Sequence, residues 1–387
     1  MASLPGLDTK VKFDHTLYAG LWDDFCSFLP LPFHATGPPM PSEFSLIERF
    51  FARRARAHAR ADTPAHHAIL GIGDDCALLA LRADEALAVS TDMLVEGRHF
   101  LPDVDPRALG HKALAVNLSD LAAMGAAPLG FTLALALPDA NEAWLDAFSD
   151  GLFALAERYD CELIGGDTTA GPRNLCITVF GSTPPALALR RDRAQAGDDV
   201  WVSGTLGDAR AGLGVLRGEW RCAAQDAAAF RHALEWPQPR IASGLALRGI
   251  AHAAIDISDG LAGDLLHILE RSHMNARIDV DALPRSAALA RLPLQIQRQC
   301  TLAGGDDYEL CFTAAPAQRD AIEASAGQTG VPVTRIGTIT PLKQDTDTDT
   351  EASARTANFH APTITWHNAG GTMLDLTPRG FDHFSND

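Results

Sequence analysis

The chain has 387 residues, of which 47% are hydrophobic and 21% charged, and its formal net charge is −17. This length suffices for two or three domains, each with its own core, and the composition is that of a folded globular protein. The acidic balance argues against binding to nucleic acid or to a membrane surface, because both require basic surface on the protein. It is compatible with bound divalent cations.

The cysteines and lysines exclude several kinds of site. The seven cysteines are scattered without C-x-x-C spacing, which predicts reduced thiols and no zinc or disulfide framework. The chain begins without a signal-peptide pattern and has no apolar span of about 18 residues, so we expect a cytoplasmic protein. None of the four lysines lies in a G-x-x-x-x-G-K-[ST] pattern, which excludes a P-loop. Another cation must therefore neutralise any bound nucleotide phosphates.

In chain order, residues 1–41 show no periodicity and are predicted to be an irregular extension. Ser45 and Glu48 then form a capping-box pattern at the start of a helix. A second helix is expected at 106–124, with Asp105 before Pro106 at its start. The other elements expected in this first domain, residues 42–187, are strands at 68–70, 77–81, 86–90, 130–137 and 175–182 and a helix at 141–159.

Strands and helices alternate again in a second domain, residues 195–387. Strands are expected at 199–203, 253–257, 307–313 and 331–339, with helices before 252 and at 260–271. Residues 341–360 contain an Asp-Thr repeat and are predicted to be a disordered insertion. The pattern predicts an α+β protein of two domains.

Aspartates recur beside glycines or hydroxyl residues near the expected strand ends. Any one of these clusters could be an ordinary turn or helix cap, but six are more than turns require. The clusters are G-I-G-D-D-C at 71–76, S-T-D at 90–92, N-L-S-D at 117–120, G-G-D-T-T at 165–169, D-I-S-D-G at 256–260 and G-G-D-D-Y-E-L at 304–310.

Asp120 is the aspartate that a turn explains least well. On the expected helix it shares a face with Ala113, Asn117 and Met124, where an unpaired buried carboxylate is costly, so it needs a cation. Carboxylate and hydroxyl oxygens suit Mg²⁺, which proteins often bind together with substrate phosphates. Aspartates converging from different strands would hold several Mg²⁺ ions on a nucleoside triphosphate and supply the positive charge that lysine does not.

These residues resemble a known family, the bacterial thiamine-monophosphate kinases of the aminoimidazole ribonucleotide synthetase-like superfamily. The match runs from Phe44 to Phe384 in the family's order. Besides the aspartate clusters, it includes F-S-L-I-E-R-F at 44–50, S-T-D-M-L-V-E-G-R-H-F at 90–100 and A-V-N-L-S-D-L-A-A-M-G-A at 115–126.

The resemblance implies an N-terminal domain whose sheet forms a homodimer, a C-terminal α+β domain, and ATP bound between the two. The implied reaction is Mg²⁺-dependent transfer of the γ-phosphoryl group of ATP to thiamine monophosphate, which gives thiamine diphosphate and ADP.

The resemblance also implies roles for individual residues. His99 and Asp306 would contact thiamine monophosphate, and Asp75, Asp120 and Asp256 would act in catalysis through the metal ions. ATP would be bound by Gly166, Asp167, Arg191 and Ser258, although Arg190 and Arg193 leave the register of the arginine open. The implied Mg²⁺ ligands are Asp75, Ser90, Thr91, Asp92, Asp120, Asp167, Asp256 and Asp259.

Two departures from the family pattern concern the substrate. Relatives commonly carry Glu where this chain has Asp306, whose side chain is one methylene shorter. Relatives also place an aromatic residue just before the terminal G-[FY]-D-H-F motif, where this chain has Leu376, Thr377 and Pro378. The aromatic side chain that would stack on thiamine is therefore not located, and Trp366 is a candidate for it.

Two alternative functions are weighed. The chain could be another ATP-dependent synthetase of the same superfamily, although the motifs at 90–100 and 115–126 favour the kinase. It could also be a thiamine-phosphate binding protein without catalytic activity, which the retained aspartates argue against.

Overall fold

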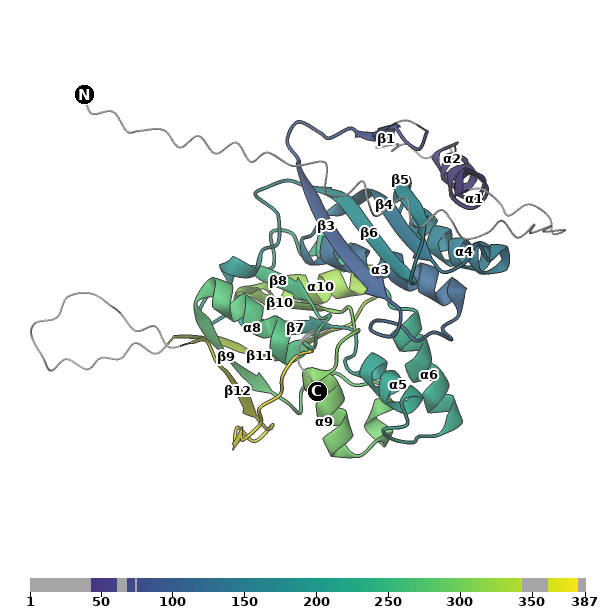
Figure 1. The fold of residues 1–387 in the computed structure, drawn as a ribbon. Helices are drawn as coiled ribbons and strands as arrows, with labels where there is room; N and C mark the ends of the chain where they lie inside the picture. The colour runs from purple at the N-terminus through teal and green to yellow at the C-terminus, as the bar shows by residue number, and fades with distance from the viewer. Residues whose placement is uncertain (1–42, 61–67, 74, 343–360, 382–387) are drawn as a thin grey trace, which may run out of the picture. The chain divides into compact units, whose positions relative to one another are not determined.

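The fold is described from a computed structural model over residues 43–60, 68–73, 75–342 and 361–381. Within these residues the chain forms helices and two large β-sheets, a four-stranded sheet from the first half and a seven-stranded sheet from the second (Figure 1). This confirms the expected α+β fold class. The expected extension, residues 1–41, and most of the expected insertion, residues 343–360, lie outside the described residues.

The first helical segment begins where the capping-box pattern predicts a helix. It consists of α1 (Glu43–Leu46), a π-helical segment (Ile47–Ala52) and α2 (Arg53–Arg60). Phe50 and Phe51 are buried and anchor it to the core. The short strands β1 (Ala68–Leu70) and β2 (Leu78–Leu79) follow and pair with each other in antiparallel orientation.

The four-stranded sheet has the order β3-β6-β4-β5, with β3 at one edge and β5 at the other. Its strands are β3 (Ala86–Val95), β4 (Ala127–Leu137), β5 (Glu162–Ala170) and β6 (Asn174–Thr183), and only the pair β4 and β5 is parallel. β3 extends five residues beyond the predicted strand. β5 is not predicted at all, because its glycines read as a turn. Gly166 has a φ of +150°, and a Cβ there would lie 2.0 Å from the carbonyl oxygen of Leu133.

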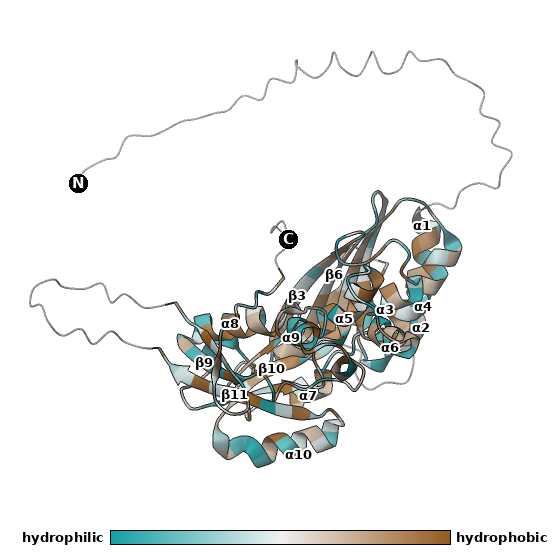
Figure 2. Ribbon diagram, turned by 90° about the horizontal axis from the view of Figure 1, so that it is seen from below, coloured by the Kyte–Doolittle hydropathy of each residue, from teal (hydrophilic) through white to brown (hydrophobic). Residues whose placement is uncertain are grey.

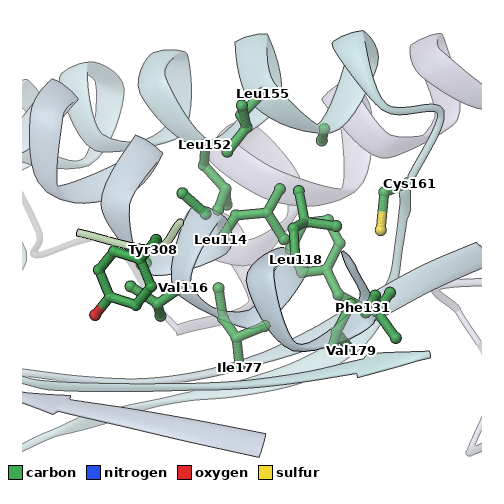
Figure 3. Packing of buried hydrophobic residues seen from close by; sticks show 14 of the residues in the cluster. Leu114, Val116, Leu118, Phe131, Leu152, Leu155, Cys161, Ile177, Val179 and Tyr308 are labelled. Atoms are coloured by element: carbon green, nitrogen blue, oxygen red, sulfur yellow. The ribbon is translucent and has the colours of Figure 1, made fainter. Parts of the chain in front are cut away.

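The helices α3 (Pro106–Ala123) and α4 (Glu142–Arg158) cover one face of this sheet (Figure 3). The Asp105 side chain caps α3 by accepting a hydrogen bond from the backbone N–H of Arg107 at 3.0 Å, as the sequence predicts. Nearly every side chain of α3 is buried, which is typical of a helix packed on all sides. Leu114 and Leu118 of α3 and Leu152 of α4 meet Phe131 of the sheet in the core shown in Figure 3.

The seven-stranded sheet has the order β13-β12-β9-β11-β7-β10-β8 and is antiparallel except for the pair β12 and β9. Its strands are β7 (Asp199–Ser203), β8 (Ala253–Asp256), β9 (Met274–Asp279), β10 (Leu310–Ala314), β11 (Val333–Pro341), β12 (Ile364–His367) and β13 (Met373–Leu374). The sequence predicts β7 with the same bounds and β8, β10 and β11 with shifted ends, but not the others.

The helices α8 (Leu261–Ser272) and α10 (Arg319–Thr329) lie on opposite faces of this sheet (Figures 1 and 2). In Figure 2, α10 shows mostly hydrophilic and neutral colours, and Ile322 and Ser325 are its buried residues. The remaining helices are α5 (Asp208–Leu216), α6 (Ala224–Glu235), α7 (Ile241–Ala246) and α9 (Leu294–Ala303).

Both sheets belong to one compact unit, residues 41–387, and share a hydrophobic core. α3 lies within this core, because its residues pack against β3, β4 and β6 on one side and against β8 and α7 on the other. Tyr308 and Phe312 of the second half are buried in the same cluster as Leu114. The contact between α3 and β8 positions the candidate site. In the described part of the chain, no helix is long and apolar enough to cross a membrane.

Candidate active site

A cavity of about 1010 Å³ lies where the two halves of the chain meet. Asp92, near the end of β3, and Asp120, in the last turn of α3, line it from the first half. Asp256, at the end of β8, lines it from the second half, together with Ser258 and Asp259 of the loop that leads into α8. Asp306, of the cluster at 304–310, lines it as well, so four of the predicted aspartate clusters converge on one cavity.

Hydrogen bonds from α3 and β3 hold these carboxylates in place. Ser119 of α3 donates its hydroxyl hydrogen to Oδ2 of Asp256 at 2.7 Å, across the junction between the two halves. Ser90 of β3 donates a hydrogen bond to Oδ2 of Asp120. The backbone N–H of Asp92 donates to Oδ1 of Asn117 at 3.1 Å. Residues 117–119 of α3 thus hold the Asp256 carboxylate and the backbone of Asp92, and Ser90 of β3 holds the Asp120 carboxylate.

Burial raises the pKa values of these carboxyl groups, and neighbouring carboxylates raise those of Asp92 and Asp256 further. Burial, followed by the charges of Asp120 and Asp259, raises the pKa of Asp92 to about 7. Burial, with the charges of Asp120 and Asp92, also raises the pKa of Asp256 to about 7, although the bond from Ser119 opposes this shift. Burial raises the pKa of Asp120 as well, against the opposing effects of Ser90 and Arg191. The cavity therefore favours the binding of cations or protons.

Arg191 is the arginine whose charge acts on this cluster, since it lowers the pKa of both Asp120 and Asp256. It lines a second cavity, of about 370 Å³, together with Ser90 and Asp120. The neighbouring Arg190 instead forms an ion pair with Asp192. Arg190 also lines this second cavity, so the choice of Arg191 over Arg190 and Arg193 as the arginine that contacts ATP stays a prediction.

His99 and Asp306 line the large cavity beside the carboxylates and also a small apolar pocket that adjoins it. Nδ1 of His99 accepts a hydrogen bond from the backbone N–H of Val95 at 3.0 Å, so the hydrogen of the neutral ring lies on Nε2. Asp306 forms an ion pair with Lys112 of α3, whose Nζ lies 2.8 Å from Oδ1. Sequence analysis does not identify Lys112 as part of the site.

Thr91, Gly166 and Asp167 are exposed and line neither the large cavity nor the second one. Thr91 lies between Ser90 and Asp92 in β3, so its side chain points to the other face of the sheet, where its Oγ1 lies 2.9 Å from Oγ1 of Thr178. Gly166 and Asp167 lie in β5, at the opposite edge of the sheet.

Asp75 is exposed in the segment between β1 and β2 and lines neither of these cavities. The single chain therefore does not bring it to Asp120. The expected roles of Asp75, Thr91, Gly166 and Asp167 stay predictions.

Two aromatic residues line the cavity, the buried Tyr308 and the exposed Phe381, and sequence analysis identifies neither as a site residue. The Phe381 ring is 48% exposed and lies under the guanidinium of Arg98, at 4.9 Å from ring centroid to Cζ. The backbone N–H of Phe381 donates to the carbonyl oxygen of Asp259 at 2.9 Å, which holds the C-terminal segment against the site. The candidate Trp366 is wrong, because its side chain is buried in the core of the second sheet.

No group of three or more His, Cys, Asp or Glu side chains among the described residues is already arranged as a metal site. The residues nevertheless fit Mg²⁺, because their donors are hard oxygens and because burial, followed by neighbouring carboxylates, disfavours their charged forms without a cation. Mg²⁺ usually keeps several waters and shares its coordination with substrate phosphates, so a complete cage of protein ligands is not required.

Comparisons with known proteins agree with this geometry. The profiles of the AIR synthase related protein N-terminal and C-terminal domains match residues 73–183 and 195–348. The thiamine-monophosphate kinase of Salmonella typhimurium is 52% identical over 299 residues, which cover 76% of this chain and 89% of the relative.

Two solved structures are also similar. A thiamine-monophosphate kinase from Stenotrophomonas maltophilia has 50% sequence identity and a TM-score of 0.71, with 76% of this chain and 94% of that chain covered. AaThiL complexed with AMPPCP and TMP has 27% identity and a TM-score of 0.64, with 90% of this chain and 100% of that chain covered.

We expect the carboxylate cluster to make the metal-free protein less stable as the pH rises. The folded pKa values of Asp92 and Asp256 are about 7, whereas an unfolded aspartate titrates near ~3.9. At a pH between these two values, the aspartates are protonated in the folded protein and ionised in the unfolded protein. Proton binding therefore stabilises the folded protein; this stabilisation is complete below the unfolded pKa and is lost as the pH rises through the folded pKa. Melting temperatures in EDTA and in Mg²⁺ across this window test the expectation, and Mg²⁺ should reduce the loss.

Asp256→Asn should flatten the pH dependence in EDTA, because the amide does not titrate and still accepts the bond from Ser119. Asp84→Asn, in an exposed turn that lines neither cavity, is the control and should follow the parent. An Asp256→Asn variant whose melting temperature varies with pH as the parent's does would contradict the expectation.

Proposed function

Because the chain belongs to the thiamine-monophosphate kinases, within the AIR synthase related proteins, we propose that it transfers the γ-phosphoryl group of ATP to thiamine monophosphate. The products are thiamine diphosphate and ADP. The observation that carries the proposal is the convergence of Asp92, Asp120 and Asp256 from both halves on the cavity that His99 and Asp306 also line.

The chemistry of the reaction explains why carboxylates surround the cavity. The acceptor is a phosphate monoester whose second pKa is near ~6, so it is largely ionised at neutral pH and needs no strong general base. The obstacle is the approach of two polyanions, and a catalyst must neutralise their charge and align them. Bound Mg²⁺ supplies this positive charge and bridges phosphate oxygens.

The residues that would hold Mg²⁺ in the cavity are Asp92, Asp120, Asp256 and Asp259, with Ser90 beside Asp120. Asp120 is shared between the large cavity and the one that Arg191 lines, so it lies at the junction of the two spaces. We assign the donor side to this junction.

Arg191 would hold phosphate oxygens of ATP, and Ser258 would contact the nucleotide from the second half. The AMPPCP bound by the similar AaThiL is an analogue of ATP, which supports ATP as the phosphoryl donor here.

The acceptor side would be formed by His99, Asp306 and Phe381. Nε2–H of His99 can donate a hydrogen bond, the Asp306 carboxylate can pair with the thiazolium cation or accept from the amino group of the acceptor, and the Phe381 ring can stack on a heterocycle. Phe381 takes the place of the aromatic residue that the sequence does not locate.

The exposed face of the four-stranded sheet supports a homodimer. Leu87, Val89 and Met93 alternate along β3 on this face and are 43%, 54% and 52% exposed. β3 is also an edge strand of ten residues, and long apolar edge strands are normally covered in native proteins. We propose that a second copy of the chain covers this face and edge.

The first test incubates the protein with ATP, Mg²⁺ and thiamine monophosphate and resolves the products. Thiamine diphosphate and ADP in equal amounts are expected. Binding of thiamine monophosphate without turnover would favour the inactive binding protein, and ATP cleavage without phosphorylation of thiamine monophosphate would favour another synthetase of the superfamily.

Asp120→Asn should reduce kcat by about 10²- to 10³-fold, the usual effect of losing one preorganised electrostatic group. Asparagine is nearly isosteric and can still accept the hydrogen bond from Ser90, so the fold should remain. The melting temperature without metal should rise, because the amide relieves charge repulsion in the cavity. Steady-state kinetics over a Mg²⁺ titration and melting curves in EDTA measure both effects.

Asp208→Asn is the matched control for Asp120→Asn. Asp208 is also half-buried and accepts a bond from a serine, Ser286, at 2.6 Å, and burial also raises its pKa, but it does not line the cavity. It should keep the parent's kcat. A kcat for Asp120→Asn within about threefold of the parent at saturating Mg²⁺ would show that Asp120 is structural.

Phe381→Ala should raise the KM for thiamine monophosphate by about fivefold, with a smaller change in the KM for ATP, since an aromatic stacking contact contributes about 1 kcal/mol. Phe381→Tyr keeps the ring and should behave like the parent. Because half of the ring is exposed, the melting temperature should change little. An equal rise in both KM values would place Phe381 outside the acceptor side.

Leu87→Lys should dissociate the proposed dimer, because it places a charge on the face that the second copy would cover. Sedimentation or light scattering should show a monomer for the variant and a dimer for the parent. Leu294→Lys is the control, since Leu294 is 51% exposed but belongs to α9 in the second half. If the parent is itself a monomer, the proposed dimer is wrong.

A further inference from the structure

Lys112 is the one lysine of this chain within the described residues, and it is buried in the middle of α3 with 4% exposure. A buried ammonium group is costly unless it is paired. Its ion-pair partner is Asp306, from the loop before β10, and Nζ lies 2.8 Å from Oδ1. The pair therefore joins the two halves of the chain at the cavity wall.

The backbone of Asp306 and a second side-chain contact also fix its position. Its φ is +68°, an uncommon conformation for a residue other than glycine, and its N–H donates to the carbonyl oxygen of Ser258 at 2.8 Å. The hydroxyl of Tyr308 donates to Oδ1 of Asp306 at 3.2 Å. Both side-chain contacts thus use Oδ1, and the carboxyl group remains 30% exposed to the cavity. This arrangement presents Oδ2 to a ligand.

Lys112 and Asp120 lie on the same face of α3. They are eight residues apart, with Val116 between them, and Val116 and Asp120 both line the large cavity. Eight residues correspond to about 12 Å along a helix. The carboxylate of Asp306, paired with Lys112, therefore lies beside one end of this helix face, and the carboxylates around Asp120 lie at the other.

We propose that Lys112 is a positioning residue for the acceptor. Its ammonium group fixes the orientation of the Asp306 carboxylate and neutralises it, which keeps Asp306 from sharing Mg²⁺ with the cluster around Asp120. Oδ2 is then available to the thiazolium or amino group of thiamine monophosphate. This inference rests on the proposed function, and it adds a residue that acts on the substrate through Asp306.

Lys112→Met tests the inference, because methionine fills similar volume without charge. We expect the KM for thiamine monophosphate to rise by about tenfold or more, as for the loss of a hydrogen bond to a charged group, while kcat and the KM for ATP stay within about threefold. The Kd of thiamine monophosphate, measured by calorimetry in Mg²⁺ without ATP, should rise in parallel. His111→Gln is the control: His111 is also buried in α3 and contacts the carbonyl oxygen of Pro237 at 2.7 Å, but it lines neither pocket.

The double variant Lys112→Met/Asp306→Asn separates positioning from folding. It leaves neither charge unpaired, so it should be more stable than Lys112→Met alone, yet its KM should be no higher than that of Asp306→Asn. The inference is wrong if the two substitutions raise the KM for thiamine monophosphate by factors that multiply in the double variant. It is also wrong if Lys112→Met raises the KM values for thiamine monophosphate and ATP equally.

The calorimetric measurement separates this inference from the proposed function. A parent that binds thiamine monophosphate without phosphorylating it would overturn only the function, since the Kd values of the variants still test Lys112. A parent that neither binds nor phosphorylates it would overturn both.

Discussion

The repulsion between carboxylates that two halves of the chain bring to one cavity is the constraint on which the site depends. Burial raises the pKa values of Asp92, Asp120 and Asp256, the charge of Asp120 raises those of Asp92 and Asp256 further, and Ser90, Ser119 and Arg191 offset only part of the shifts. The fold tolerates this because large apolar clusters hold the elements in place. A protein arranged in this way is more stable with cations bound, so the binding of Mg²⁺ and of phosphates that carry it is coupled to the stability of the cavity.

α3 sets the spacing between the charged groups of the cavity. The helix begins at a capped N-terminus, is packed on nearly all sides, and carries a buried cation at Lys112 and a carboxylate at Asp120 on the same face. Because a buried helix is stiff, the spacing between the two charges is set by its backbone. At one end of the cavity the Asp306 carboxylate is paired with Lys112. The carboxylates around Asp120 lie at the other end, and only this end needs a metal ion.

The sequence predicts local features well and long-range contacts poorly. The capped helix at 106–124 and the buried face of Asp120 follow from local patterns, and the structure confirms both. β5 escapes prediction because Gly165 and Gly166 suggest a turn, although Gly166 is required by the close approach of Leu133. Lys112 could have been identified from the sequence, because it lies eight residues before Asp120 on the same predicted helix. Phe381 belongs to the terminal G-[FY]-D-H-F motif, but local patterns do not place it at the site, since a backbone hydrogen bond to Asp259, more than a hundred residues earlier, brings it to the cavity.

The predicted ligands that lie outside the cavity indicate that part of the site depends on dimer formation. Thr91 and Asp167 lie on β3 and β5, the two opposite edges of one sheet. Three strand spacings separate these edges, about 14 Å, so one Mg²⁺ ion does not reach both within one chain. In a two-fold dimer whose sheets pack face to face around an axis along the strands, the strand order of one sheet is reversed over the other, so β3 of one chain lies over β5 of its partner, whereas pairing of the two β3 edges would keep β3 and β5 apart. If these residues are metal ligands, as the family resemblance implies, their site then depends on the proposed dimer, whereas the cluster around Asp120 is formed by a single chain.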